Sequence, residues 1–305
     1  MHAAALRYVD AVARYGSIRR AAAELNISAS AINRQILQLE DLLGVELFER
    51  RASGLKPTEF GEMVIEHARR TLHDFEALKS EIGYGRNWLT GLVRIATLDS
   101  LTINVLPRAM IAFRELHPAV RFRIETHDPT GVARLVSNDS ADIGLTFGSE
   151  THAGITVRHQ VPASLCAVMH SRHPLAQRKR LSVFECQSDD MILQEDSGPV
   201  GGFLGSEIEA VKRASKPILT SDTIVASKAY ILSGGGVGFF TRFGFIEEIE
   251  AGDVVAIPLV EERPSSLTLA TIVSSARRKS RTVDGFIDQL SSILDAEVAG
   301  GAIKP

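Results

Sequence analysis

The chain lacks the features of a membrane or exported protein. No run of roughly 18 apolar residues occurs among its 305 residues, and no charged segment followed by an apolar core begins it. It has only two cysteines, which in a cytoplasmic chain are most often free thiols. Its composition, 45% apolar and 23% charged, is that of an ordinary globular protein of about two or three domains. We therefore expect a cytoplasmic protein of bacterial type.

Enzyme signatures are missing as well. The motifs GxSxG, HExxH, CxxC and GxxxxGK followed by Ser or Thr are absent. The glycine-rich run 234–238 lacks the spacing of a dinucleotide loop and is more typical of a tight turn into a strand. We assign no catalytic residue, no metal and no cofactor. An enzyme built on the carboxyl-terminal α/β domain is the weaker alternative.

Residues 1–58 carry the spacing of a helix-turn-helix. Gly16 ends a first helix, Ser17 can cap a second, and Ser28 can cap a third after a four-residue turn. The third helix ends at Gly44. Its apolar positions repeat every three or four residues, which predicts a buried stripe of Ile32, Ile36, Leu39 and Leu43.

The opposite face of this third helix offers groups that match base edges in the DNA major groove. Asn33 and Gln38 suit adenine, and Arg34 suits guanine. A hairpin wing beyond the helix would bring basic residues to phosphates or the minor groove. An ordinary polar helix face is the alternative, but the turn, the caps and the wing together favour DNA. The predicted DNA-binding residues are Ser28, Ser30, Asn33, Arg34, Gln38, Arg50, Arg51, Lys56 and Thr58.

The segments AAAELNIS (21–28), QILQLEDLLG (35–44) and LFER (47–50) resemble the amino-terminal domain of LysR-type transcriptional regulators. The similarity extends in layout over the whole chain, and HPLA (173–176) is a tetrad common in the family's effector domain. The resemblance implies a regulator of double-stranded DNA that responds to a small-molecule effector and acts as a homodimer or homotetramer. The family commonly has Gln, Pro and Ser where this chain has Ala29, Ser30 and Asn33, which puts its usual half-site in doubt.

The net charge of −3 is unevenly spread. Residues 1–58 carry seven Arg and one Lys against four Glu and two Asp, a net of +2, whereas residues 59–88 carry −2 and residues 89–305 carry −3. The basic excess therefore lies where DNA would dock. Because it is small, we expect few phosphate contacts per subunit and a dependence on dimerisation.

Residues 59–88 predict a long linker helix that pairs with a partner helix. Steps of three and four place a seam on one side, with Lys79 as the polar member that could set register. The alternative is packing on the wing domain, but a helix of about 25 residues is about 38 Å long and exceeds such a domain. The expected seam is Ile65, Ala68, Leu72, Phe75, Lys79 and Ile82. Its pairing implies an inverted-repeat DNA site.

Beyond residue 89 strands and helices alternate, which predicts parallel sheets. Strands are expected at 92–98, 120–126 and 141–147, then at 165–169, 191–194, 217–220, 236–240 and 267–273. Two lobes joined by crossing strands resemble the type 2 periplasmic-binding-protein fold that the family uses as a sensor. The predicted α/β multidomain protein thus has a winged helix-turn-helix at 1–58, a linker helix at 59–88 and an effector domain at 89–305. Lobe 1 comprises about 89–161 and 266–305, and lobe 2 about 162–265.

Ligands of open parallel sheets bind beyond the carboxyl ends of strands. Several Ser and Thr residues there lie near helix starts, where backbone N–H groups favour an anionic head group, so a small organic acid is the expected effector. Plain helix capping is the alternative, and Asp99, Asp128 and Asp222 leave the ligand's charge open. The predicted effector-binding residues are Ser100, Leu101, Thr102, Thr130, Phe147, Ser197, Gly198, Phe203, Thr220 and Asp222.

A thiol redox switch is the other regulatory hypothesis. Cys166 lies in an apolar strand and is expected to be buried and inert. Cys186 follows Phe184 near a helix end, where we expect it to be reachable.

Overall fold

The computed structural model of this chain describes residues 2–51, 54–82, 89–148, 154–187, 190–194, 206–214, 216–276 and 279–300. They form two units, which divide between residues 82 and 89. No helix among these residues is long and apolar enough to cross a membrane.

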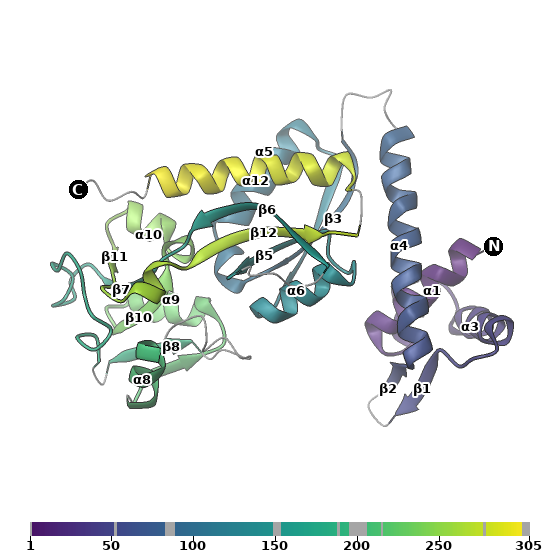
Figure 1. Ribbon diagram of the computed structural model, residues 1–305, viewed down its shortest axis with the longest axis horizontal. Coiled ribbons are helices and arrows are strands. Elements are labelled where there is room, and N and C mark those ends of the chain that lie inside the picture. Colours follow the sequence, from purple (N-terminus) through teal and green to yellow (C-terminus); the bar gives the residue numbers. More distant parts are fainter. Residues whose placement is uncertain are drawn as a thin grey trace. The chain divides into compact units, whose positions relative to one another are not determined.

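The amino-terminal unit contains α1 (His2–Tyr15), α2 (Ile18–Leu25), α3 (Ala29–Leu43), the hairpin β1 (Phe48–Arg51) and β2 (Gly54–Pro57), and α4 (Glu59–Ile82) (Figure 1). Side-chain oxygens begin the inner helices as predicted: Ser17 accepts a hydrogen bond from Arg20 N, and Ser28 accepts one from Ala31 N. Gly44 ends α3 in the left-handed conformation, with φ of 69°.

The core of this unit explains the fixed angle of α3. Ile32 and Ile36 are buried against α1 and α2, as predicted, and Leu39 packs against the same core while half-buried. Leu43 was predicted in this stripe but is 46% exposed. The prediction was wrong there because Leu43 is the last residue of α3, and the chain turns away at Gly44.

The first half of α4 packs on its own unit. Ile65 and Ala68, predicted as part of a seam for a second chain, are buried within this unit, so the alternative interpretation is correct for them. Asp10 of α1 accepts a hydrogen bond from Arg69 Nε at 2.8 Å. The second half differs: Leu72 is half-buried and Phe75 is 50% exposed.

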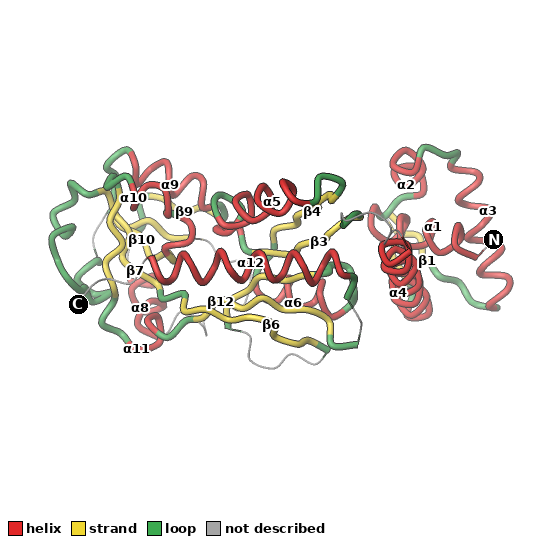
Figure 2. The backbone as a smooth tube through the Cα atoms, turned by 90° about the horizontal axis from the view of Figure 1, so that it is seen from above, coloured by secondary structure: helices red, strands yellow, loops and turns green. Residues whose placement is uncertain are grey.

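Lobe 1 of the carboxyl-terminal unit is a five-stranded sheet in the order β4-β3-β5-β12-β6. Its elements are β3 (Gly91–Thr97), β4 (Val120–Thr126), β5 (Ile143–Phe147), β6 (Ile155–Pro162), β12 (Thr268–Ser274), α5 (Val105–Leu116), α6 (Pro129–Ser137) and α12 (Arg281–Gly300). Alternate residues of β3 serve opposite faces: Ile95 packs in the core under α5 and α12, and Ala96 packs in the core under α6. Figure 2 shows α5 and α12 running side by side over the sheet.

Lobe 2 is a second five-stranded sheet in the order β11-β7-β10-β8-β9. Its elements are β7 (Leu165–His170), β8 (Met191–Gln194), β9 (Leu219–Ser221), β10 (Val237–Thr241), β11 (Val254–Pro258), α8 (Ser206–Ala214), α9 (Ile224–Leu232), α10 (Ile246–Glu250) and α11 (Glu262–Ser265). Leu165 and Ala167 of β7 face the core that includes α8, while Cys166 and Val168 face the core that includes α9.

The lobes are joined by two crossing segments, which lie between β6 and β7 and between β11 and β12. Ala163 N donates to Leu267 O at 2.8 Å, so the crossings are hydrogen-bonded to each other. The 3₁₀ turns η2 (Asp99–Leu101) and η3 (Arg242–Gly244) also meet here, and Phe243 of lobe 2 is buried in the main core of lobe 1.

The expectation of parallel sheets is correct in part. β3 pairs in parallel with β4 and β5, and β8 pairs in parallel with β9 and β10. β12 instead returns antiparallel between β5 and β6. The strands β6 and β11 were not predicted, and both lie at sheet edges, where hydrophobic patterning is weakest.

Candidate functional site

One face of α3 presents polar side chains to solvent. Ser30, Arg34 and Gln38 are exposed at intervals of four residues, and Asn33 beside them is half-buried. Gln38 Oε1 accepts a hydrogen bond from Gln35 Nε2 at 2.7 Å, whereas Arg34 has no hydrogen-bond or ion-pair partner among the described residues. The guanidinium of Arg34 is therefore free to bind another molecule.

The other predicted DNA-contact residues fall into two groups. Arg50, Arg51 and Lys56 are exposed on the β1–β2 hairpin, and Arg51 forms a 2.6 Å ion pair with Glu49. Thr58 is a helix cap: its hydroxyl donates to Glu46 O and accepts from Gly61 N, which begins α4. Ser28, whose hydroxyl caps α3, is likewise used inside the protein.

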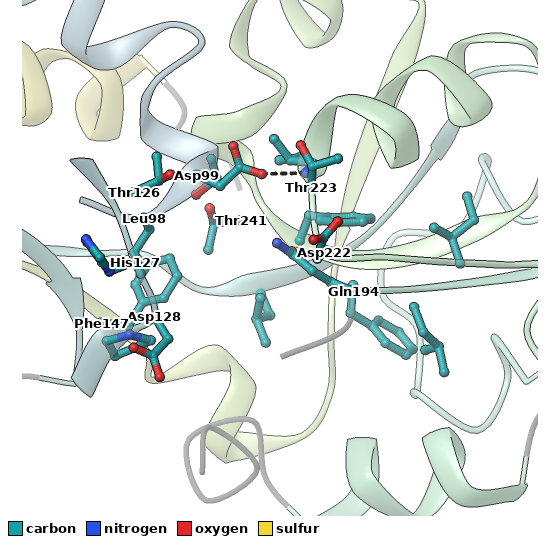
Figure 3. Close-up of a pocket in the computed structure, with 18 of the residues that line it drawn as sticks. Leu98, Asp99, Thr126, His127, Asp128, Phe147, Gln194, Asp222, Thr223 and Thr241 are labelled. Carbon is teal, nitrogen blue, oxygen red and sulfur yellow. Dashed lines mark hydrogen bonds between the residues drawn. The ribbon is translucent and has the colours of Figure 1, made fainter. Parts of the chain in front are cut away.

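A cavity of about 430 Å³ lies between the lobes, at the carboxyl ends of strands from both sheets (Figure 3). Of the predicted effector-binding residues, it brings together Ser100 after β3, Phe147 at the end of β5 and Asp222 after β9. Asp99 and Asp128 line the same cavity. The strand-end rule therefore located the cleft.

Other predicted effector-binding residues do not line this cavity. Leu101 is fully buried in the lobe 1 core, and the Thr102 hydroxyl donates to Asp99 O. Thr130 and Thr220 are exposed outside the lining. Ser197, Gly198 and Phe203 lie outside the described residues.

Two of the helix starts around the cleft, those of α6 and α9, are already capped by side chains of the protein. Asp99 of lobe 1 accepts a 2.6 Å hydrogen bond from Ile224 N, at the first turn of α9 in lobe 2 (dashed in Figure 3). Thr223 caps the same turn by accepting from Val225 N. Asp128 accepts from Gly131 N in the first turn of α6. At the starts of α9 and α6, the N–H groups of Ile224, Val225 and Gly131 thus already donate to protein oxygens.

Two cleft residues were missed by sequence reasoning, although the same rule could have found them. His127 immediately follows β4, and Thr241 is the last residue of β10. Both line the cavity and are labelled in Figure 3. Thr241 was missed because β10 was expected to end one residue earlier, at Phe240.

Ion pairs also link the lobes. Arg108 of α5 forms a 2.7 Å pair with Glu297 of α12 and approaches Glu247 and Glu250 of lobe 2 at 3.8 and 3.7 Å. Within lobe 2, Lys228 is held between Glu248, at 2.7 Å, and Gly244 O, at 3.1 Å. The second contact ties α9 to η3 beside the cleft.

Both cysteines are buried. Burial raises the pKa of Cys166 to about 11, against the lowering effect of nearby Arg242. Burial, with Glu185 and Glu261 nearby, raises the pKa of Cys186 to about 12. The expectation that Cys186 is reachable was wrong, because its side chain packs in the core under α8. No cluster of metal-binding side chains occurs among the described residues.

Two regions of the chain match known sequence families. Residues 3–62 match the bacterial regulatory helix-turn-helix protein of the lysR family, and residues 87–294, more than half of the chain, match the LysR substrate binding domain. The chain belongs to the LysR family of transcriptional regulators. This LysR-type regulator therefore combines a DNA-binding domain with an effector-controlled domain, and the proteins similar to it are regulators rather than enzymes.

Individual relatives differ in how much of the chain they match. The probable HTH-type transcriptional regulator LrrA of Synechococcus elongatus is 36% identical over 145 residues, which is 48% of this chain and 49% of LrrA. The HTH-type transcriptional regulator CysB of Burkholderia cenocepacia is 27% identical over 304 residues, which is 97% of this chain and 94% of CysB. A full-length OxyR variant of Pseudomonas aeruginosa superimposes with a TM-score of 0.69 at 18% identity, covering 96% of this chain and 94% of that one. The last likeness concerns the fold alone.

Proposed function

We propose that this LysR-type regulator reads DNA with the exposed face of α3 and positions itself with the β1–β2 wing. The observation that carries the proposal is Arg34, which is exposed on α3 and has no partner among the described residues. An arginine so placed can donate two hydrogen bonds to guanine in the major groove. Ser30, Asn33 and Gln38 would supply the neighbouring contacts.

The basic wing residues would contact phosphates. Arg50 and Lys56 are exposed and available, whereas Arg51 would first have to exchange its ion pair with Glu49. Ser28 and Thr58 would act indirectly, because their hydroxyls cap α3 and α4 and so fix the recognition helix and the wing.

A small-molecule effector would control DNA binding by occupying the cleft between the lobes. A small molecule bound between the lobes changes their relative angle only if it binds one arrangement more tightly than another. The contacts that such a movement would alter are the Asp99–Ile224 hydrogen bond and the approach of Arg108 to Glu247. The lobes would pivot at the paired crossing segments.

The expected organic-acid effector draws little support from the cleft. That expectation rested on free N–H groups at helix starts, and Asp99 and Asp128 accept hydrogen bonds from those of α9 and α6. A simple carboxylate bound at either of these two N–H groups would have to displace a carboxylate of the protein.

For assembly we propose a homodimer through the second half of α4, with a homotetramer as the larger form. Phe75 and Leu78 are about half exposed there, unlike Ile65 and Ala68. A dimer would present two copies of α3, so the DNA site should be an inverted repeat. We place its action in the cytoplasm, with the DNA.

The redox hypothesis has less support, because both thiols are buried and their pKa values are raised, which keeps them protonated. Substituting Ser for Cys166 and Cys186 tests it directly. If DNA binding by the Ser variants responds to peroxide as in the wild type, the redox hypothesis is wrong. If the response is lost in these variants, the hypothesis is supported.

The experiment that tests DNA reading is fluorescence anisotropy with the DNA flanking the gene of this protein, against a scrambled duplex, at two salt concentrations. We expect specific binding that persists at the higher salt and falls about tenfold or more in Arg34→Ala, since one good bidentate contact contributes about 1–3 kcal/mol. Asn33→Ala should weaken it further. Arg134→Ala, an exposed arginine on α6, is the matched control. Equal binding to both duplexes would contradict the proposal.

A further inference from the structure

We infer that the cleft selects an effector that carries a positively charged amine or guanidinium group. The inference rests on the proposed control by a small molecule bound in this cleft and names its chemical class. Three carboxylates, those of Asp99, Asp128 and Asp222, line the cavity. Among its described lining residues, none is Lys or Arg, and His127 is the only one that can become cationic.

Two basic side chains of lobe 2, those of Arg242 and Lys228, do not line the cavity. Arg242 follows Thr241 in sequence but does not line the cavity. Lys228 is committed to Glu248 and to the carbonyl of Gly244. A cationic group would therefore enter a cavity whose described lining has an excess of negative charge.

The carboxylates that line the cavity keep unused acceptor positions. Asp99 and Asp128 each use one oxygen to accept a backbone N–H, and the second oxygen of each has no donor among the described residues. Asp222 is exposed at the cleft and has no donor among those residues. An ammonium or guanidinium supplies only donors, so it complements these acceptors as a carboxylate cannot.

An independent observation is the hydroxyl of Thr241. This side chain is only 4% exposed, it lines the cavity, and its oxygen has no hydrogen-bond partner among the described residues. Figure 3 shows it pointing toward Asp99, with Gln194 extending toward the cleft from β8. Buried hydroxyls are normally paired, so an unpaired one on a cavity wall indicates a place for a polar ligand group.

The remaining lining suits the carbon skeleton of such a ligand. Phe147 of lobe 1 and Phe239 of lobe 2 are half-buried in the wall, and aromatic faces attract ammonium and guanidinium groups. The volume of about 430 Å³ lies in the usual range of small-molecule sites. A diamine, an aminoalkylguanidine or a basic amino acid matches this size and charge.

The test uses the full-length protein with cationic amines and with dicarboxylates of similar size, of which cadaverine and glutarate are matched in length and opposite in charge. Thermal unfolding is followed with cadaverine, agmatine and lysine, and in parallel with glutarate and succinate. We expect a rise in Tm with at least one amine and none with the dicarboxylates. No shift with any of the three amines, or a larger shift with a dicarboxylate, overturns the inference.

Variants then locate the binding. Asp222→Asn should weaken the amine that binds by about tenfold, because one exposed carboxylate at the cleft is neutralised. Thr241→Val, which replaces the hydroxyl by a methyl, should weaken it several-fold, and Thr241→Ser should restore most of the affinity. Asp253→Asn, an exposed aspartate outside the cavity, is the charge-matched control. Equal loss in Asp222→Asn and Asp253→Asn would show non-specific attraction and overturn the inference.

The same probes separate this inference from the proposed function. An amine that binds the cleft without altering DNA binding would support the inference and count against effector control. A dicarboxylate that binds the cleft and alters DNA binding would support effector control and count against the inference.

Discussion

The two units use their charged groups in opposite ways. On α3 and the wing, Arg34, Arg50 and Lys56 are exposed and project outward, as a surface that meets a polyanion requires. In the cleft the charged groups are carboxylates, and Asp99 and Asp128 already bind backbone N–H groups. The exposed basic side chains of α3 and the wing thus suit a large anionic partner. The cleft instead offers the carboxylate oxygens of Asp99 and Asp128 that accept no hydrogen bond from the described residues.

The units also differ in what holds them together. The amino-terminal unit depends on local caps and on a close backbone approach, in which a Cβ on Gly61 would clash with Leu47 O. The carboxyl-terminal unit has in addition ion pairs between segments much further apart in the chain, such as Arg108 with Glu297. Substitutions in one unit should therefore leave the other unit folded.

The largest effect is expected from Lys228→Met. It leaves the carboxylate of Glu248 buried without its cation, and breaking such a pair typically costs about 3 kcal/mol or more. Urea unfolding with hydrogen-exchange mass spectrometry should place the loss in lobe 2 alone. Adding Glu248→Gln should recover part of the stability. Equal loss of protection in α1 to α3 would contradict the independence of the units.

Gly61→Ala should act on the other unit. The added methyl group meets the backbone of Leu47, so α4 or the wing must shift, at a cost of about 2 to 3 kcal/mol. Specific DNA binding should fall, while an amine that binds the cleft should bind as before. Gly300→Ala, at the end of α12 with open space around it, is the control and should be neutral. Specific DNA binding at wild-type strength would show that this close approach is not needed.

Lys56→Ala should have a smaller effect, confined to DNA. Removal of one phosphate contact lowers the slope of log affinity against log salt by about 0.9 and weakens specific and scrambled duplexes alike. Anisotropy at several salt concentrations measures this slope. Lys179→Ala, an exposed lysine of lobe 2, should leave it unchanged. A selective loss for the specific duplex would instead assign Lys56 to base reading.

The smallest effect concerns pH. The pKa values of Cys166 and Cys186 are raised from 9.0 to about 11 and 12, so their protonated thiols favour the folded state. This contribution is fully present below about pH 9 and falls as pH rises toward 11 to 12, because the unfolded chain loses its thiol protons first. Urea unfolding between pH 8 and 10 should show a weaker decline when both cysteines are Ala. Alkylation of the native thiols at pH 8 should be slow, and rapid alkylation would contradict their burial.

Local signals predicted the amino-terminal unit well. The caps Ser17 and Ser28 and the terminator Gly44 act within a few residues along the chain, so their effect can be read without knowing the fold. Errors arose where another segment decided the outcome. Ile65 and Ala68 have the periodicity of a helix seam, but the same periodicity serves packing on α1, and sequence alone does not distinguish the two partners.

In the carboxyl-terminal unit, too, features set by local sequence were predicted, and features set by distant segments were not. Strand ends marked Asp99, Ser100, Phe147 and Asp222 for the cleft, because the carboxyl edge of a parallel sheet is a property of chain direction. The antiparallel return of β12 between β5 and β6 was not predictable, since it pairs segments more than a hundred residues apart.

Residue types and their order were enough to predict the third helix of the helix-turn-helix and the edge of the sheets where the cavity lies. The charge that this ligand should carry was decided only in three dimensions. Asp99 accepts the N–H of Ile224, 125 residues away, so a donor at the start of α9 that was expected for an anion is already used. A hydrogen-bond donor satisfied by a distant residue looks free in a sequence, because only folding brings its acceptor to it.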